Sequence, residues 1–191
     1  MILGMGPWIG VDVGGRKKAF DVAVVHGRSV VELRSRQSVE DVVELTRVVR
    51  PAVVAVDSPR SAAPAGATHR LGERLLRQAV CGIRWTPARA QLQGNPYYEW
   101  IVEGLRLYEA LRDVRVEVIE CFPTASWTRW HGPRGSVRRA PWTRQALQGL
   151  GLDGVPARTN QDQRDAIAAA LTAAAYARGH CDRYGDIVVP R

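Results

Sequence analysis

The sequence predicts an α/β fold in which three antiparallel strands are followed by strands that helical crossovers bring into the same sheet. Two observations predict it. Three short apolar runs at 7–13, 18–26 and 29–34 follow one another with glycine turns between them. Each later apolar run of strand length follows a segment with helical periodicity. This order gives a mixed sheet with helices on its faces.

The first half of the chain gives the clearest signals. The strand at 7–13 ends at Gly14-Gly15, and a turn at Gly27 separates the strands at 18–26 and 29–34. Ser38 and Asp41 form a capping-box pattern that opens a helix, and Pro51 ends it. The nearly continuous apolar run at 52–57 is typical of a strand that is covered on both faces.

The second half alternates between helices and strands. A loop rich in Pro, Ala and Ser spans 58–68, and residues 124–160 are rich in Trp, Arg and Gly. The predicted elements are, in chain order, helices at 69–80 and 97–112, a strand at 114–120, a short helix near 141–149, a helix at 161–178 and a strand at 186–190. Asn160 is a predicted N-cap of the last long helix.

Composition limits the class of protein. The 191 residues suit a single domain, 1–191, and a hydrophobic content of 46% indicates a globular chain. No apolar run approaches the ~18 residues of a membrane span, so we predict no membrane contact. The first seven residues carry no basic leader, so we predict no signal peptide and a cytoplasmic protein.

The net charge of +8 favours an anionic partner, with DNA or RNA first. A second explanation stays open, because Lys17 and Lys18 are the only lysines and nearly every base is arginine. A GC-rich genome produces the same bias without selection for binding.

Several acidic residues lie at positions that are predicted to be buried, where an ionised carboxylate is destabilising. Asp12, Asp57 and Glu120 lie inside or at the end of apolar runs that are predicted to be buried strands. A carboxylate removed from water costs several kcal/mol unless a cation, a metal or several donors receive it. Asp162 and Asp165 open the alanine-rich last helix, and a turn of ~100° per residue puts them on one face.

These acids predict a divalent-metal site. Oxygen ligands without His or Cys nearby favour Mg²⁺ or Mn²⁺ over zinc. Two such ions ~4 Å apart can activate water and stabilise the leaving oxygen of a phosphodiester. For the two helix acids a structural explanation stays open, because acids in a first helical turn complement the helix dipole.

Four motifs together resemble the domain-of-unknown-function 429 family, predicted nucleases of the RNase H-like fold. They are Gly10-Val11-Asp12 with Gly14, Ala55-Val56-Asp57-Ser58-Pro59, Ile119-Glu120-Cys121-Phe122-Pro123 and Asp162-Gln163-Arg164-Asp165-Ala166, joined by a similar middle helix at 70–83. The resemblance implies an RNase H-like sheet with Asp12, Glu120 and Asp165 as core metal ligands. Asp57 and Asp162 are further candidates.

Five residues are predicted to contact nucleic acid. Arg16 and Lys17 follow the Gly14-Gly15 turn, whose backbone N–H groups suit a phosphate, although a solvated hairpin turn explains them equally well. Trp130, Arg138 and Arg139 lie in a stretch where arginines alternate with tryptophans, and such rings can stack on bases. Trp100, by contrast, has a helical spacing that predicts packing.

The first hypothesis is a Mg²⁺- or Mn²⁺-dependent nuclease. Asp12 would bridge two ions, Glu120 and Asp165 would complete the ligand sets, and Asp57 or Asp162 would orient water or hold an outer position. A nucleotide-binding protein related to actin and sugar-kinase ATPases is the second hypothesis, which Mg-ATP stabilisation would support. The third is a non-catalytic nucleic-acid-binding module, whose binding would ignore metal.

Overall fold

The computed structural model describes residues 6–191; residues 1–5, part of the segment that predicts no signal peptide, lie outside the described chain. A single mixed sheet organises this part of the protein, with the strand order β3-β2-β1-β4-β5-β7-β6. The strands are β1 Trp8–Asp12, β2 Phe20–His26, β3 Ser29–Gln37, β4 Val53–Asp57, β5 Glu117–Cys121, β6 Cys181–Tyr184 and β7 Ile187–Pro190. Strands β1, β2 and β3 are antiparallel neighbours, whereas β1, β4, β5 and β7 run parallel. The predicted mixed topology is confirmed.

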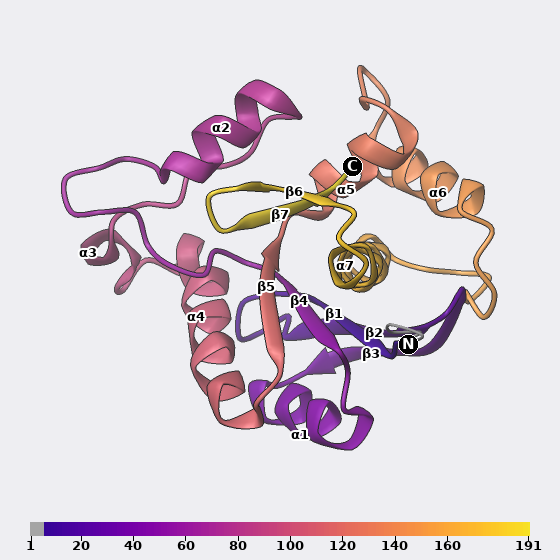
Figure 1. Cartoon of the computed structure of the whole chain (residues 1–191). Helices are drawn as coiled ribbons and strands as arrows, with labels where there is room; N and C mark the ends of the chain where they lie inside the picture. The colour runs from indigo at the N-terminus through magenta and orange to yellow at the C-terminus, as the bar shows by residue number, and fades with distance from the viewer. Residues whose placement is uncertain (1–5) are drawn as a thin grey trace.

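Helices cover both faces of the sheet (Figure 1). Helices α1 (Val39–Val49) and α4 (Glu99–Leu111) pack on one face, against the alternating apolar side chains of β1 and β4. Helices α5 (Pro123–His131), α6 (Arg139–Gly149) and α7 (Gln161–Ala177) cover the other face. The remaining helical segments are α2 (Leu71–Ala79), α3 (Arg89–Leu92), η1 (Pro96–Tyr98) and η2 (Arg112–Val114). The central strands have nearly continuous apolar sequences because both faces of the sheet are covered.

The second half of the chain differs in places from the prediction. Helix α5 lies inside a stretch in which only one short helix, near 141–149, is predicted. It begins with Pro123, which suits a first helical position, and it is stabilised by burial of Ala125 and Trp127 rather than by a long periodic pattern. Strand β6 is also unpredicted, because it is short and carries charged residues. Strand β5 begins at Glu117 rather than 114, because η2 occupies 112–114.

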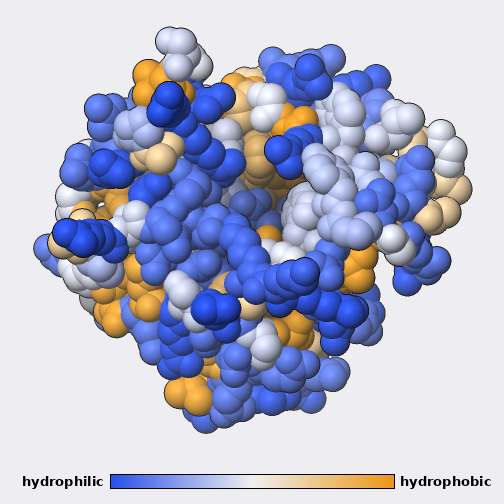
Figure 2. All heavy atoms as spheres, turned by 180° about the vertical axis from the view of Figure 1, so that it is seen from behind, coloured by the Kyte–Doolittle hydropathy of each residue, from blue (hydrophilic) through white to orange (hydrophobic). Residues whose placement is uncertain are grey.

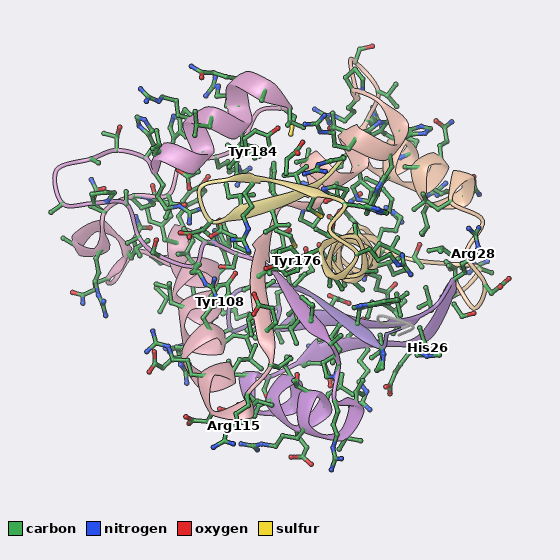
Figure 3. All side chains as sticks on the ribbon, in the orientation of Figure 1. His26, Arg28, Tyr108, Arg115, Tyr176 and Tyr184 are labelled. Carbon is green, nitrogen blue, oxygen red and sulfur yellow. The ribbon has the colours of Figure 1, made fainter. Side chains whose placement is uncertain are left out.

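Two polar contacts fix loops to this framework (Figure 3). Arg28, in the turn after β2, donates to the carbonyl oxygens of Leu150 and Gly151 at 3.0 Å each. The hydroxyl of Tyr108 on α4 donates to the carbonyl oxygen of Ser58 at 2.9 Å. The second contact fixes the backbone that leaves β4, immediately after Asp57.

The surface seen from behind is mainly hydrophilic, and hydrophobic residues gather in a hollow in the upper part of that view (Figure 2). Within residues 6–191 no helix is long and apolar enough to cross a membrane.

Helix α7 lies unusually close to β1. A Cβ atom built on Gly10 would stand 2.1 Å from the backbone nitrogen of Ala170 and 2.2 Å from the backbone oxygen of Ala166. Both partners are backbone atoms, so neither can rotate away. The buried residues of α7 that face the sheet are mostly alanines, whose side chains are short, so the helix backbone lies directly against the central strand.

We predict that Gly10→Ala destabilises the protein by at least about 3 kcal/mol, the upper end of typical overpacking costs. Urea denaturation measures the change. Gly149→Ala is the control, because a Cβ there meets no heavy atom within 4 Å and the helical position favours alanine. Equal stabilities of the two variants would contradict the close contact.

Candidate metal and nucleic-acid site

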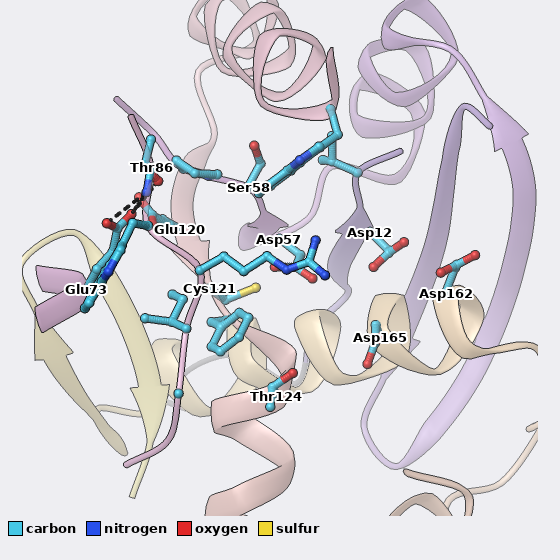
Figure 4. Close-up of a pocket in the computed structure, with 18 of the residues that line it drawn as sticks. Asp12, Asp57, Ser58, Glu73, Thr86, Glu120, Cys121, Thr124, Asp162 and Asp165 are labelled. Atoms are coloured by element: carbon cyan, nitrogen blue, oxygen red, sulfur yellow. Dashed lines mark hydrogen bonds between the residues drawn. The ribbon is translucent and has the colours of Figure 1, made fainter. Parts of the chain in front are cut away.

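Three aspartates form a row across the centre of the sheet. Asp12 on β1 pairs in register with Asp21 on β2 and with Asp57 on β4. Side chains at paired positions of neighbouring strands point to the same face, which here is the face covered by α7. The first turns of α7 add Asp162 and Asp165 beside Asp12 and Asp57 (Figure 4). The structure therefore brings together four of the five predicted acids.

Oxygen atoms from different carboxylates approach one another closely in this cluster. One ligand atom each from Asp12, Asp21 and Asp162 lies within 4.8 Å of the others. That spacing suits a shared cation, because a hard metal ion binds carboxylate oxygens at ~2.0–2.6 Å. The cluster offers only oxygen ligands, as the sequence predicts for Mg²⁺ or Mn²⁺.

Burial and mutual repulsion raise the pKa values of these acids. Asp12 is 8% exposed, and its burial, followed by the charges of Asp57 and Asp165, raises its pKa well above the ordinary value. Burial, with the charge of Asp165 next, raises the pKa of Asp57 to about 8. Burial also raises the pKa of Asp165 and of Asp21. An added cation would favour the ionised forms of all four.

Internal partners neutralise the helix acids but not the central strand acids. Lys18 Nζ lies 2.8 Å from an oxygen of Asp162, and Arg139 donates to Asp165 at 2.8 Å. Asp165 also accepts hydrogen bonds from Trp127 Nε1 and Gln161 Nε2. Of the residues that the structure describes, none forms an ion pair or a side-chain hydrogen bond with the other two acids, Asp12 and Asp57.

Glu120, the fifth predicted acid, lies apart from this cluster. It pairs in register with Val56 rather than with Asp57, so its side chain leaves the sheet on the opposite face. Both of its oxygens accept from the guanidinium of Arg70, and one accepts from the backbone N–H of Arg60 at 2.8 Å. The structure thus gives Glu120 a cation of its own, and Asp57 takes the place beside Asp12 that the resemblance implied for Glu120.

Glu120 belongs to a second buried network. Arg70 also donates to Glu73, whose carboxylate accepts from the backbone N–H and the hydroxyl of Thr86. Figure 4 shows Glu73, Thr86 and Glu120 grouped on one side of the site and the aspartates on the other. This network connects β5, α2 and the segment that follows α2.

Asp21 is an acid of this cluster that was not predicted, although it too lies within an apolar run. It lies in the apolar run of β2, between Phe20 and Val22, and is 5% exposed. In the structure the Ser35 hydroxyl donates to one of its oxygens, and Gln163 Nε2 donates to Ser35 at 3.1 Å. Asp21 is thus held in place by a strand neighbour and by α7.

A cleft of about 690 Å³ opens above the aspartates. Its lining includes the four clustered aspartates Asp12, Asp57, Asp162 and Asp165, and also Glu120. Its walls carry bases and tryptophans, namely Lys18, Arg77, Arg84, Arg134, Arg139, Trp85, Trp100 and Trp142. A lining that carries both acids and bases makes the cleft suited to a phosphate-containing ligand that is bound through metal ions.

Of the five predicted nucleic-acid contacts, only Arg139 lines this cleft. Arg16 donates instead to Glu103 at 2.9 Å, and Trp130 packs against the core with its ring edge-on to Trp127. Lys17 and Arg138 are exposed outside the cleft lining. Trp100, which the sequence predicts to pack in the helix, is half-buried and lines the cleft.

A family model described as "Protein of unknown function (DUF429)" matches residues 10–188. The chain belongs to the DUF429 family. The resemblance found in the four sequence motifs is therefore confirmed. No curated protein matches the chain by sequence.

Solved structures show the fold of this DUF429 protein. The structure of RuvC from Thermus thermophilus matches with a TM-score of 0.51 and 19% identity, over 90% of this chain and 94% of RuvC. RuvC from the same organism in complex with Holliday junction substrate matches with a TM-score of 0.51 and 16% identity, over 90% and 96% of the two chains. The yeast mitochondrial Holliday junction resolvase gives 0.48 and 11%, over 93% and 80%. The predicted RNase H-like fold is confirmed.

Glu120 and Asp57 lie on opposite faces of the sheet, so substitutions at these two positions of the DUF429 chain should affect metal binding differently. Glu120→Gln leaves the buried Arg70 without its full charge partner, so we expect a loss of about 3 kcal/mol, the lower end for a broken buried ion pair. Thermal stabilisation by Mn²⁺ should persist in that variant. Asp57→Asn should keep the stability and lose most of the Mn²⁺ effect. Thermal unfolding with and without Mn²⁺ measures both, and the opposite pattern would return Glu120 to the metal site.

The raised pKa of Asp57 predicts a pH dependence in EDTA. The folded state holds the proton up to about pH 8, whereas the unfolded chain releases it near the ordinary value of 3.8. The contribution of Asp57 to stability is therefore complete below about pH 4 and is lost as the pH rises through 8. Urea denaturation across this range should show a decline that is smaller in Asp57→Asn than in wild type or in the exposed control Asp113→Asn. Identical slopes in all three proteins would contradict it.

Proposed function

We propose that this protein is a divalent-metal-dependent nuclease that hydrolyses phosphodiester bonds of nucleic acid. The observation that supports it most is the pair Asp12 and Asp57. These acids lie side by side at the ends of two parallel strands and line a cleft that arginines also line, and no residue from 6 to 191 forms an ion pair with either of them. A fold keeps such a destabilising arrangement where a function requires it.

The residues fit Mg²⁺ or Mn²⁺. Asp12 is central in the row, so the ions would be held by Asp12 together with Asp21, Asp57, Asp162 and Asp165. When bound, such ions polarise a phosphoryl oxygen and lower the pKa of a bound water. Lys18 and Arg139, which hold Asp162 and Asp165 in the structure, would then be released.

Once released from the aspartates, the side chains of Lys18 and Arg139 could bind the phosphates of the substrate. Lys18 and Arg139 both line the cleft, and the Arg139 side chain is 44% exposed. Once metal ions neutralise the aspartates, the guanidinium can donate two parallel hydrogen bonds to the oxygens of a phosphate. The same two residues would thus compensate the acids in the empty cleft and bind the substrate in the filled one.

The likeness to RuvC supports nucleic acid as the ligand. That protein, in one of the two matching structures, is in complex with Holliday junction substrate. At 16% identity the likeness concerns the fold, so the substrate proposal for this chain depends on its own acids, arginines and net charge of +8. A junction is therefore one substrate to test beside single strands, duplexes and RNA–DNA hybrids.

We predict that Asp12→Asn abolishes cleavage and leaves the protein folded. Loss of a shared ligand removes several kcal/mol of charge stabilisation in the transition state, which corresponds to a loss of at least ~10³-fold in rate. Cleavage of labelled DNA, RNA, hybrid and junction substrates with Mg²⁺ or Mn²⁺ measures it. Asp113→Asn, at the other end of the molecule, should cut at the wild-type rate.

The same panel distinguishes the rival functions. A wild-type protein that cuts none of the substrates with either metal contradicts the nuclease proposal. Tight, salt-dependent binding that ignores metal and survives Asp12→Asn would then identify a non-catalytic binding module.

A further inference from the structure

One wall of the cleft presents a fixed aromatic surface. Trp85 is half-buried in the segment that follows α2 and lines the cleft. The guanidinium carbon of Arg77 lies 5.1 Å from the centre of its ring, and the His69 ring lies 4.8 Å away and tilted by 37°. These two neighbours restrain the orientation of the indole while the residue stays partly open to the cleft.

The backbone beside Trp85 is also fixed. The next residue, Thr86, donates its N–H and hydroxyl to the buried carboxylate of Glu73. Glu73 is held by Arg70, which in turn holds Glu120 on β5. A wall anchored in this way needs little ordering when a ligand binds, so contacts to it cost less entropy.

Unpaired bases accompany the aromatic wall. Arg77, Arg84 and Arg134 line the cleft, and none of them forms an ion pair with any residue from 6 to 191. A second half-buried indole, Trp100 at the start of α4, lines the same space. Arg77 and Arg84 lie over the rings of Trp85 and Tyr97, so their charges are not neutralised by carboxylates. Aromatic rings interleaved with such guanidiniums are the contacts that bind bases and phosphates of a single strand.

The size and depth of the cleft favour an unpaired strand over a duplex. A volume near 690 Å³ falls in the ~300–1,000 Å³ range of pockets that hold a drug-sized ligand, which corresponds to one or two nucleotides. In a duplex the bases stack on each other. A base must therefore leave that stack before it can contact an indole inside a cleft.

We propose that this cleft binds an unpaired stretch of DNA or RNA, with a base stacked on Trp85 in the place that the Arg77 guanidinium occupies over the ring, and with phosphates held by Arg77, Arg84 and Arg134. This inference rests on the proposed nuclease function, because it places the strand across the aspartates. It defines the substrate class as strands that are unpaired at the site of cleavage, whether free or within a branched structure.

Binding measured without cleavage tests the inference. In the Asp12→Asn background with EDTA, fluorescence anisotropy would compare a labelled single strand of about 12 nucleotides, as DNA and as RNA, with the blunt duplex of the same sequence. We expect the single strands to bind at least ~10-fold more tightly than the duplex. Trp85→Ala should lower single-strand affinity by about 10-fold and leave duplex affinity within about twofold.

Two further variants control for folding and for charge. Trp85→Phe keeps an aromatic face and should retain most of the affinity, so a loss in both Trp85 variants with normal thermal unfolding would argue against stacking. Arg84→Ala should weaken binding and reduce its salt dependence, whereas Arg112→Ala, an exposed arginine paired with Glu109 outside the cleft, should not.

The outcomes separate this inference from the nuclease proposal. Equal affinity for single strand and duplex, or an equal effect of Trp85→Ala on both, overturns the inference even if wild type cuts nucleic acid. Single-strand binding that depends on Trp85 supports it even if wild type cuts nothing, and only the nuclease proposal then fails.

Discussion

The close approach of α7 to β1 is the contact on which the site depends. Aspartate side chains are short, so acids from a helix and from a strand can share a cation only when the two backbones nearly touch. Gly10 has no side chain, and the facing residues of α7, including Ala166 and Ala170, have almost none. Two residues beyond Gly10 on the strand lies Asp12, and the first turns of the helix carry Asp162 and Asp165. The packing of the core and the assembly of the acids thus result from the same contact.

Charge compensation divides the acids into two classes. Asp162 and Asp165 lie near bases that arise from flexible, partly exposed side chains, Lys18 and Arg139. Within residues 6–191, Asp12 and Asp57 in the strand row have no such partner, and burial followed by the charges of neighbouring acids raises their pKa values. Replacement of these two acids by apolar residues would relieve the repulsion, so stability alone does not explain them. The proposed metal site would account both for these two acids and for the partly exposed bases beside them.

The limits of prediction from sequence follow from what local patterns encode. Apolar runs predicted β1, β2, β4 and β5 and the acids within them, because an acid inside an apolar run can be recognised from the sequence alone. The sequence did not show to which face of the sheet each acidic side chain points, since a shift of one residue in the pairing register moves a side chain to the other face. Glu120 therefore seemed equivalent to Asp57, although it pairs with Val56 and faces away. Asp21 was missed for lack of a motif, and Trp85 because a loop has no periodicity that reveals its neighbours.

Glu120 has a structural role, because its position lets it hold Arg70. Its carboxylate, 3% exposed, holds Arg70 at the start of α2, and Arg70 holds Glu73. Through Thr86 this chain of contacts reaches the residue next to Trp85, so an acid on the far face of the sheet fixes the wall of the cleft. Buried ion pairs add little net stability compared with apolar packing, but they fix geometry where removal of one partner is costly. The two acidic networks thus differ in role: in the proposed function the aspartates would hold the metal ions, and the paired glutamates fix the wall that carries Trp85.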